Sequence, residues 1–209
     1  MWIKCFLKAC LFSACLAIVP INGYAQILTL QELSDQLREH KGLRADFEQH
    51  RMLQGFSKPI ISKGTLLVVE GKGLIWHQHT PISVLYVIND EQVKSQVANN
   101  EPTIIDSKSN PQMFYFSSLL KSIMQADQKV LDETFDMNLT SDSDNWTLSL
   151  VPKVSPINKI FAHIELKGQS FVDSLILNDK QNDSTSLKFT NQHSDNIKLT
   201  EDEKNLLGL

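Results

Sequence analysis

The stretch GTLLVVEGKGLIWHQHTP, from Gly64 to Pro81, decides the fold class of this chain. It holds two apolar runs, Gly64 to Glu70 and Leu74 to His79, which are joined by Gly71-Lys72-Gly73. Two such runs around a short glycine-bearing loop predict a β-hairpin, because glycine adopts the backbone angles that tight turns need. The hairpin could be the wall of an apolar cavity, the edge of an enzyme site or a metal site, and the rest of the chain decides between them.

A period of two recurs on both sides of this hairpin, which indicates more strands. We expect them at Leu43–Met52, Ile82–Asn89, Val93–Ala98, Thr103–Ile105, Thr134–Thr140, Trp146–Val151, Ile160–Lys167, Phe171–Asn178 and Ser184–Asn191. Turn signals separate the later strands at intervals of about ten residues, which is typical of antiparallel sheets.

Three segments have a helical pattern instead. Thr29-Leu30-Gln31-Glu32 is a capping box that opens a helix from Thr29 to about Lys41, and Thr200-Glu201-Asp202-Glu203 repeats this pattern near the C-terminus. Asn110 to Asp127 interrupts the strands with a helical period. The predicted fold class is therefore mainly β (α+β). A single curved antiparallel sheet forms an incomplete β-barrel, and helices cover its open mouth.

The N-terminus predicts export. Lys4 and Lys8 precede a short apolar run, and small residues precede Gln26, so we expect residues 1–25 to be a signal peptide and residues 26–209 to be one domain. The segment Phe12-Ser13-Ala14-Cys15 leaves open that Cys15 is lipidated instead. All three cysteines lie in this leader, so the mature chain offers no disulfide and no thiolate.

The charge of the mature chain excludes some classes of partner. The whole chain has 20 basic and 24 acidic residues, and removal of Lys4 and Lys8 leaves 18 basic residues against 24, a net charge near −6. Nucleic-acid binding and electrostatic docking on anionic lipid both need basic patches, so neither is expected.

His77 and His79 are the strongest candidates for chemistry. Two histidines at this spacing on a strand share a face, which suits a metal ion, but no pattern supplies a third ligand. An exposed polar face is the favoured interpretation, and we expect no metal and no cofactor. The sequence also lacks nucleophile-elbow, zinc-protease and phosphate-loop motifs, so we predict that the protein is not an enzyme.

Apolar surface is the remaining signal. Side chains on adjacent strands are expected to line one face of the sheet: Leu66, Val68, Leu74, Trp76, Leu85 and Val87. A stripe on the interrupting helix is rich in Met and Phe: Met113, Phe116, Leu120 and Ile123. Such a stripe could simply seal a core. It could also be a lid, because methionine and aromatic side chains adapt to ligands of variable shape.

The order of several short motifs resembles a known family. Phe47-Glu48-Gln49 comes first, then Gly64-Thr65-Leu66, then Leu74-Ile75-Trp76 with Pro81, and late in the chain DSTSLKFTNQ from Asp183 to Gln192. In this order the motifs resemble the periplasmic outer-membrane lipoprotein carriers of the LolA family. The resemblance covers nearly the whole mature chain. Two positions depart from it, because the family usually has arginine and proline where this chain has Glu70 and Gly71.

The resemblance implies a periplasmic, monomeric chaperone that holds the acyl chains of lipoproteins or related lipids in the cavity of a half-barrel. Such a carrier receives its cargo from an inner-membrane transporter and delivers it to an outer-membrane acceptor. Two alternatives stay open: a lipid-sensing regulatory module, or an anchored acceptor if Cys15 is lipidated. We predict that Leu74 and Trp76 face the apolar interior and that both histidines face outward.

Overall fold

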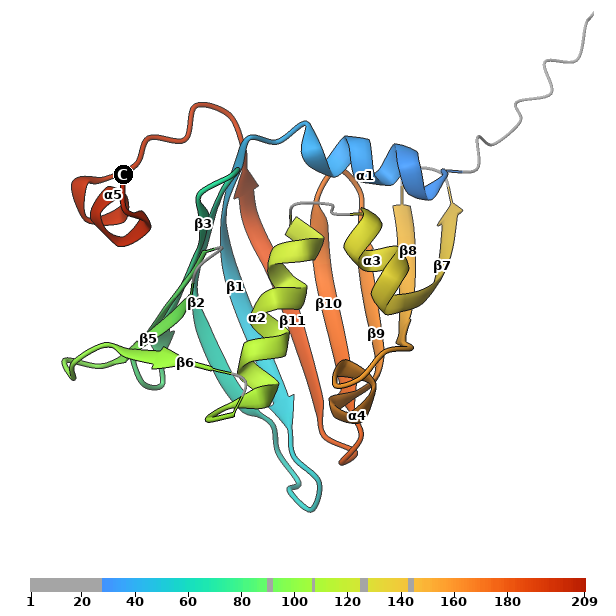
Figure 1. Ribbon diagram of the computed structural model, residues 1–209, viewed down its shortest axis with the longest axis horizontal. Coiled ribbons are helices and arrows are strands. Elements are labelled where there is room, and N and C mark those ends of the chain that lie inside the picture. The colour runs from blue at the N-terminus through green and yellow to red at the C-terminus, as the bar shows by residue number, and fades with distance from the viewer. Residues whose placement is uncertain (1–27, 90–91, 107, 125–127, 143–144) are drawn as a thin grey trace, which may run out of the picture.

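A computed structural model describes residues 28–89, 92–106, 108–124, 128–142 and 145–209 (Figure 1). The predicted signal peptide and Cys15 lie outside these residues. Within the described part, no helix is both long enough and apolar enough to cross a membrane.

The described strands form one antiparallel sheet of eleven strands, whose order is β6-β5-β4-β3-β2-β1-β11-β10-β9-β8-β7. Their bounds are β1 Gly42–Met52, β2 Ile60–Val69, β3 Gly73–Thr80, β4 Val84–Ile88, β5 Val93–Val97, β6 Thr103–Ile105, β7 Phe135–Asp142, β8 Asn145–Pro152, β9 Phe161–Gly168, β10 Val172–Asp179 and β11 Ser184–His193. Strands β6 and β7 are the two edges and do not pair with each other, so the sheet stays open. The predicted fold class is confirmed.

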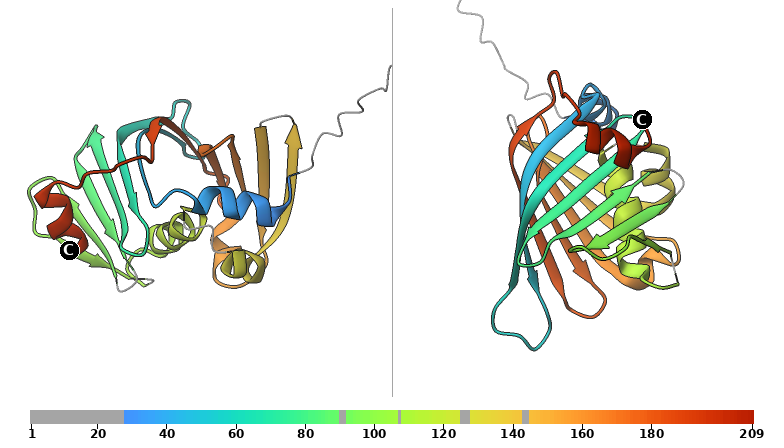
Figure 2. Two further views of the ribbon diagram at one scale, coloured as in Figure 1. Left: turned by 90° about the horizontal axis from the view of Figure 1, so that it is seen from above. Right: turned by 90° about the vertical axis from the view of Figure 1, so that its left-hand side faces the viewer.

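The sheet curves around its helices, as the view from above shows (Figure 2). Helix α2, Pro111–Met124, and helix α3, Gln128–Thr134, lie over the concave face, and α1, Leu30–Arg38, crosses one end of it (Figure 1). The four-residue helix α4, Ile157–Ile160, lies at the opposite end, and α5, Glu201–Leu207, lies outside the curve. Helices α1, α2 and α3 therefore cover the hollow side of the sheet, as the sequence predicted, whereas α5 does not.

Both predicted capping boxes are present. The Thr29 hydroxyl accepts a hydrogen bond from the Glu32 amide at 3.2 Å, and the Glu32 carboxylate accepts one from the Thr29 amide at 2.8 Å. Thr200 and Glu203 repeat the arrangement at 3.2 and 2.8 Å. Each box pairs amide groups that the first turn of a helix leaves without an intrahelical partner, and thereby fixes where the helix begins.

Each predicted strand is present, and most bounds differ by one or two residues. Strand β2 differs more, because it begins at Ile60 rather than Gly64, where Ile60 and Ile61 pair with Arg51 and His50 of β1. Helices α3 and α4 were not predicted, since seven and four residues are too few for a helical period to show.

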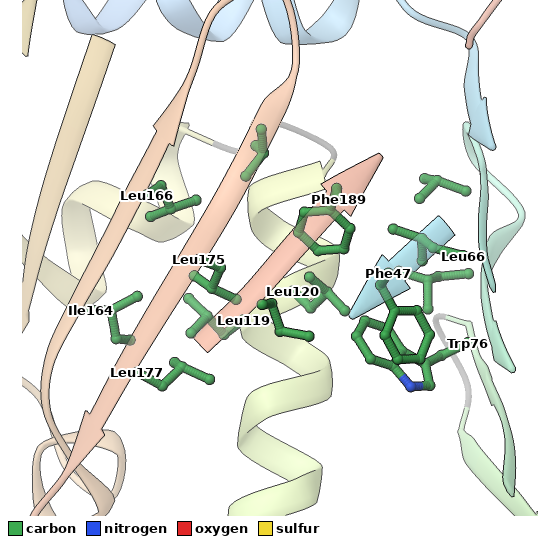
Figure 3. Packing of buried hydrophobic residues seen from close by; sticks show 14 of the residues in the cluster. Phe47, Leu66, Trp76, Leu119, Leu120, Ile164, Leu166, Leu175, Leu177 and Phe189 are labelled. Atoms are coloured by element: carbon green, nitrogen blue, oxygen red, sulfur yellow. The ribbon is translucent and has the colours of Figure 1, made fainter. Parts of the chain in front are cut away.

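The sheet has two apolar faces of unequal size. The concave face holds the large cluster, to which α1, α2 and α3 contribute Leu33, Leu119, Leu120 and Leu131 (Figure 3). The convex face holds a small cluster of Leu67, Ile75, Val87 and Leu207. The chain after β11 folds back over this second cluster, which explains the position of α5 in Figure 1.

Candidate functional site

The concave face is the candidate site, because it is a continuous apolar surface. All eleven strands contribute at least one buried apolar side chain to it. Strand alternation produces this result: every second residue of a strand points to the same face, so β8 buries Trp146, Leu148 and Leu150 while the residues between them are more exposed. A surface built this way offers many apolar contacts and few polar groups.

The centre of this surface is a stack of Phe47 on Trp76, with ring centroids 3.8 Å apart and an angle of 29° between the planes (Figure 3). Phe47 is on β1 and Trp76 is on β3, so β2 lies between them. Gly64 of β2 is paired with Phe47 and makes this possible. A Cβ atom at Gly64 would lie 2.7 Å from Cζ of Phe47 and 2.0 Å from the carbonyl oxygen of His77.

This contact gives a physical reason for the spacing of the first three sequence motifs. Each contributes one member of a cross-strand unit: Phe47, Gly64 and Trp76. The far half of the sheet repeats the arrangement, since a Cβ at Gly168 would lie 2.6 Å from Cζ2 of its strand partner Trp146. Trp146 also donates a hydrogen bond from Nε1 to the carbonyl oxygen of Gln169 at 2.7 Å, which fixes the indole at the end of the concave face.

Helix α2 covers the concave face. Leu119 and Leu120 are 3% and 1% exposed, and they lie between the two halves of the sheet in Figure 3. Ser117 is fully buried on the same helix. Its hydroxyl has no hydrogen-bond partner among the described residues, although a buried hydroxyl normally has one. Helix α2 therefore brings under cover both apolar side chains and a hydroxyl that has no partner among the described residues.

A small pocket of about 20 Å³ lies where α1 approaches the sheet, with Leu37, Leu43, Val68 and Phe171 among its walls. This space holds about one water molecule. An acyl chain that entered here would have to displace α1 or its neighbours.

Five of the ten predicted cavity residues lie on the concave face as expected: Leu66, Val68, Leu74, Trp76 and Leu120. The prediction that Leu85 and Val87 share this face is wrong. Val87 pairs with Ile75 and Leu85 pairs with His77, so both belong to the convex face. The alternation continues across the turn at Pro81 without a shift, because Trp76 pairs with Tyr86 and Leu74 with Ile88, so Tyr86 and Ile88 face inward in their place. Burial raises the pKa of the Tyr86 hydroxyl.

Met113, Phe116 and Ile123 belong to α2, but their side chains lie outside the described part of the structure. Sequence reasoning missed several residues of the concave face, namely Phe189 on β11, Leu175 and Leu177 on β10, and Ile164 and Leu166 on β9. A polar residue, Glu165 on β9 and Lys188 on β11, separates two apolar ones, which was a usable signal, whereas Ile176 lies between Leu175 and Leu177 on β10.

His77 and His79 lie on the convex face, as predicted, with ring centroids 4.2 Å apart. His77 Nε2 lies 3.3 Å from the Ser83 hydroxyl, and His79 Nε2 lies 3.3 Å from the Thr65 hydroxyl. Burial, with a contribution from His79, lowers the pKa of His77 below its ordinary value. Across the described residues, no three His, Cys, Asp or Glu side chains are placed to hold a metal ion together.

The convex face near β3 is covered by the chain after β11. Ile197, Leu199 and Leu207 pack on the small apolar cluster. Arg44 anchors this C-terminal arm, residues 194–209, by donating to both carboxylate oxygens of Glu203, at 2.7 and 3.1 Å. The hydrogen bond from Arg44 lowers the pKa of Glu203.

The turn between β2 and β3 holds the two positions that depart from the LolA pattern. Glu70 is exposed, and its amide donates to the Lys41 carbonyl at 3.0 Å. Gly71 has φ of 66°, which proline cannot adopt because its ring holds φ near −65°. The family's arginine-proline pair is therefore replaced by a turn of different geometry.

Comparison with protein-family models finds no match, and no curated protein matches the sequence. Solved structures do match. A LolA superfamily protein from Nitrosomonas europaea is 9% identical, with a TM-score of 0.47 over 85% of this chain and 97% of that one. A DUF1329 family protein from Desulfovibrio piger is 12% identical, with a TM-score of 0.48 over 82% and 92%. An outer membrane lipoprotein-sorting protein domain from Vibrio parahaemolyticus is 14% identical, with a TM-score of 0.46 over 85% and 96%.

Proposed function

We propose that the mature chain, from Gln26, is a periplasmic carrier that shields the acyl chains of lipoproteins or related lipids between the concave face and its helices. The observation that carries this proposal is the continuous apolar concave face with α2 as its cover. An acyl chain gains about 0.8 kcal/mol per methylene group that it buries. A surface to which eleven strands contribute is long enough to bury many methylene groups.

The competing interpretation is that α2 only completes a core. Two features favour a removable lid. The helix is held over the sheet by side chains such as Leu119 and Leu120 rather than by strand pairing, so it can leave without breaking the sheet. The Ser117 hydroxyl, which has no partner in the described part of the chain, also weakens the closed state, because burying a polar group without a partner costs about 1–3 kcal/mol.

The carrier would work without catalysis. Cargo would come from an inner-membrane transporter and pass to an outer-membrane acceptor, and the protein would act as a monomeric chaperone between them. The lid must open for both steps, so a modest difference in stability between closed and open states suits the task better than a rigid core.

The test is binding of a dansyl-labelled fatty acid to the mature protein, with energy transfer from tryptophan as the signal. We expect saturable binding and transfer from Trp76, which lies in the centre of the concave face. Trp76→Asp should abolish binding, because it places a charge among apolar side chains. The matched control is the double variant His77→Ala and His79→Ala, which changes the same strand on its convex face and should bind as the wild type does.

Because Trp76→Asp could unfold the protein, a second measurement follows the lid. The mature chain has no cysteine, so Lys121→Cys on α2 and Lys94→Cys on β5 each carry a single nitroxide label. We expect the fatty acid to change the mobility of the label at position 121 and not at position 94. Two results would contradict a cavity under α2. One is fatty-acid binding that leaves the mobility of the label at position 121 unchanged, and the other is loss of fatty-acid binding in the double variant His77→Ala and His79→Ala.

A further inference from the structure

The hairpin that joins β1 to β2 projects beyond the rest of the sheet at the end opposite α1 (Figures 1 and 2). Its tip is apolar and exposed. Phe56 is 65% exposed, and Met52, Ile60 and Ile61 are 36%, 48% and 44% exposed. We call these four residues the hairpin tip. Scattered exposed apolar residues are ordinary, but four within ten positions at the end of a projection form a patch.

The tip is a fixed turn. The Phe56 amide donates to the Leu53 carbonyl at 3.0 Å, and Gly55 has φ of 85°, which favours glycine. The Gln54 amide donates to the Asp183 carboxylate at 2.8 Å, which ties the loop to the neighbouring turn between β10 and β11. The backbone around Phe56 is therefore held in place while its side chain is 65% exposed.

The charges around the tip are compatible with a lipid surface. From Arg51 to Lys63 the sequence has three basic residues and no acidic one. Arg51 pairs with Asp183 of the turn between β10 and β11 at 3.6 Å, and Lys63 pairs with Glu48 of β1 at 2.7 Å, so two of the three cations lie beside carboxylates. Apolar contact, and not electrostatic attraction, is then the main contribution that this hairpin can make, which agrees with the acidic balance of the chain.

Other exposed apolar residues lie at the same end of the sheet. Strands β1, β3 and β8 run in the same direction, because each is separated from the next by one antiparallel strand or by three. The residues at and after their C-terminal ends therefore share one end of the molecule. Ile82 follows β3 and is 57% exposed, and Val151 and Val154 at the end of β8 are 45% and 41% exposed.

We propose that the hairpin tip inserts into the interfacial layer of a lipid bilayer and thereby docks this end of the protein on a membrane. A convex apolar projection needs a partner that deforms around it, and the headgroup layer of a bilayer does so. Strands β1 and β2 also carry Phe47 and Leu66, so the docking hairpin continues directly into the wall of the apolar concave face. The inference extends the proposed function, since docking would bring that face close to the source or destination of a lipid.

The test uses tryptophan as a reporter of insertion. Phe56→Trp places an indole at the tip, while the two native tryptophans of the mature chain, Trp76 and Trp146, are only 5% and 3% exposed and give a constant background. Ile104→Trp is the matched control, because Ile104 is 64% exposed on the edge strand β6, away from the hairpin. Vesicles of phosphatidylcholine alone, and of phosphatidylethanolamine with a minority of phosphatidylglycerol, are added to each variant.

We expect both kinds of vesicle to shift the emission of the Phe56→Trp variant to the blue, and brominated lipid to quench it. The emission of the Ile104→Trp variant should not change. Phe56→Asp should reduce the partition coefficient onto vesicles, measured by sedimentation, about tenfold or more, the effect of losing the burial of one phenylalanine ring. Ile104→Asp should sediment as the wild type does.

An emission spectrum of Phe56→Trp that neither vesicle alters would overturn the inference. Equal responses of the two reporters would overturn it as well, because they would mean general adsorption. A response only to vesicles with phosphatidylglycerol would replace apolar insertion by charge attraction and would also count against it. Binding of the fatty acid in solution is independent of the hairpin, so Phe56→Asp should retain it, and failure of docking is distinguishable from failure of the carrier proposal.

Discussion

Gly64→Ala tests whether the cross-strand unit of Phe47, Gly64 and Trp76 organises the concave face. The backbone of Gly64 is extended, so an ordinary glycine-to-alanine change here would stabilise the protein by about 0.4–1 kcal/mol through the unfolded state. We expect the opposite sign. The added Cβ would lie 2.0 Å from the His77 carbonyl oxygen and 2.7 Å from Cα of Gln78, and both atoms belong to the backbone of β3.

The magnitude follows from two losses. Overpacking of this kind costs about 1–3 kcal/mol. Displacement of the Phe47 ring, whose Cζ would lie 2.7 Å from the new atom, also forfeits the aromatic stack, which contributes about 0.5–1.5 kcal/mol. After subtraction of the gain from the unfolded state, the net loss is about 0.5–4 kcal/mol, with a central value of about 2 kcal/mol. For a chain of this length a loss of about 2 kcal/mol lowers Tm by about 4–8 °C.

Thermal unfolding and near-ultraviolet circular dichroism measure the two effects separately. Gly71→Ala is the control: it strains a turn with φ of 66° but places its Cβ within 4 Å of nothing. It should lower Tm without changing the aromatic spectrum, whereas Gly64→Ala should change both. A Gly64→Ala protein as stable as the wild type, with its aromatic spectrum intact, would refute the account of this contact.

Ser117→Ala should raise the free energy of unfolding by about 1 kcal/mol in a urea titration, because it removes a buried hydroxyl with no described partner; a loss of stability would mean that the hydroxyl has a partner in the folded protein. Glu203 should make the C-terminal arm sensitive to acid. Its pKa is lowered in the folded state, so its contribution is present above the unfolded value of about 4.3 and is lost as the pH falls through the folded value. Hydrogen exchange of residues 194–209 should accelerate in that pH range. In the Glu203→Gln variant the same residues should exchange quickly already at neutral pH, and acid should change their rate little. An arm that exchanges equally in both proteins at neutral pH would show that the Arg44–Glu203 pair does not anchor it.

The sequence was sufficient for the sheet because its signals are local. Alternation within strands such as β8 and β9, and capping boxes at Thr29 and Thr200, depend on residues a few positions apart. The same alternation places Leu74 and Trp76 on one face of β3, because they are two positions apart. Assigning either of them to the interior therefore predicts that both face inward.

Features that depend on distant residues could not be predicted in this way. The prediction for Leu85 and Val87 assumed a one-residue shift of the alternation across the turn at Pro81, and such a shift exchanges the two faces. The pairing of Trp76 with Tyr86 shows that the turn makes no such shift. The stack of Phe47 on Trp76 joins strands that are not neighbours in the sheet. The C-terminal arm is held to β1 by Arg44 and Glu203, a contact that spans 159 positions.

The exposed hairpin between β1 and β2 was missed for a related reason. Its apolar residues, Met52, Phe56, Ile60 and Ile61, resemble ordinary strand residues in the sequence, and only their exposure distinguishes them. The length of β2, which extends to Ile60, carries the turn beyond the end of the sheet.

The most direct test of the central claim is mass spectrometry of the intact protein purified from its native envelope, under native and denaturing conditions. The carrier account predicts a chain that begins at Gln26 and a bound acylated molecule that is released on denaturation. A diacylated N-terminus at Cys15 would indicate an anchored acceptor instead. A chain that begins at Gln26, carries no lipid and does not take up the dansyl fatty acid when offered it would contradict the claim that the concave face holds acyl chains.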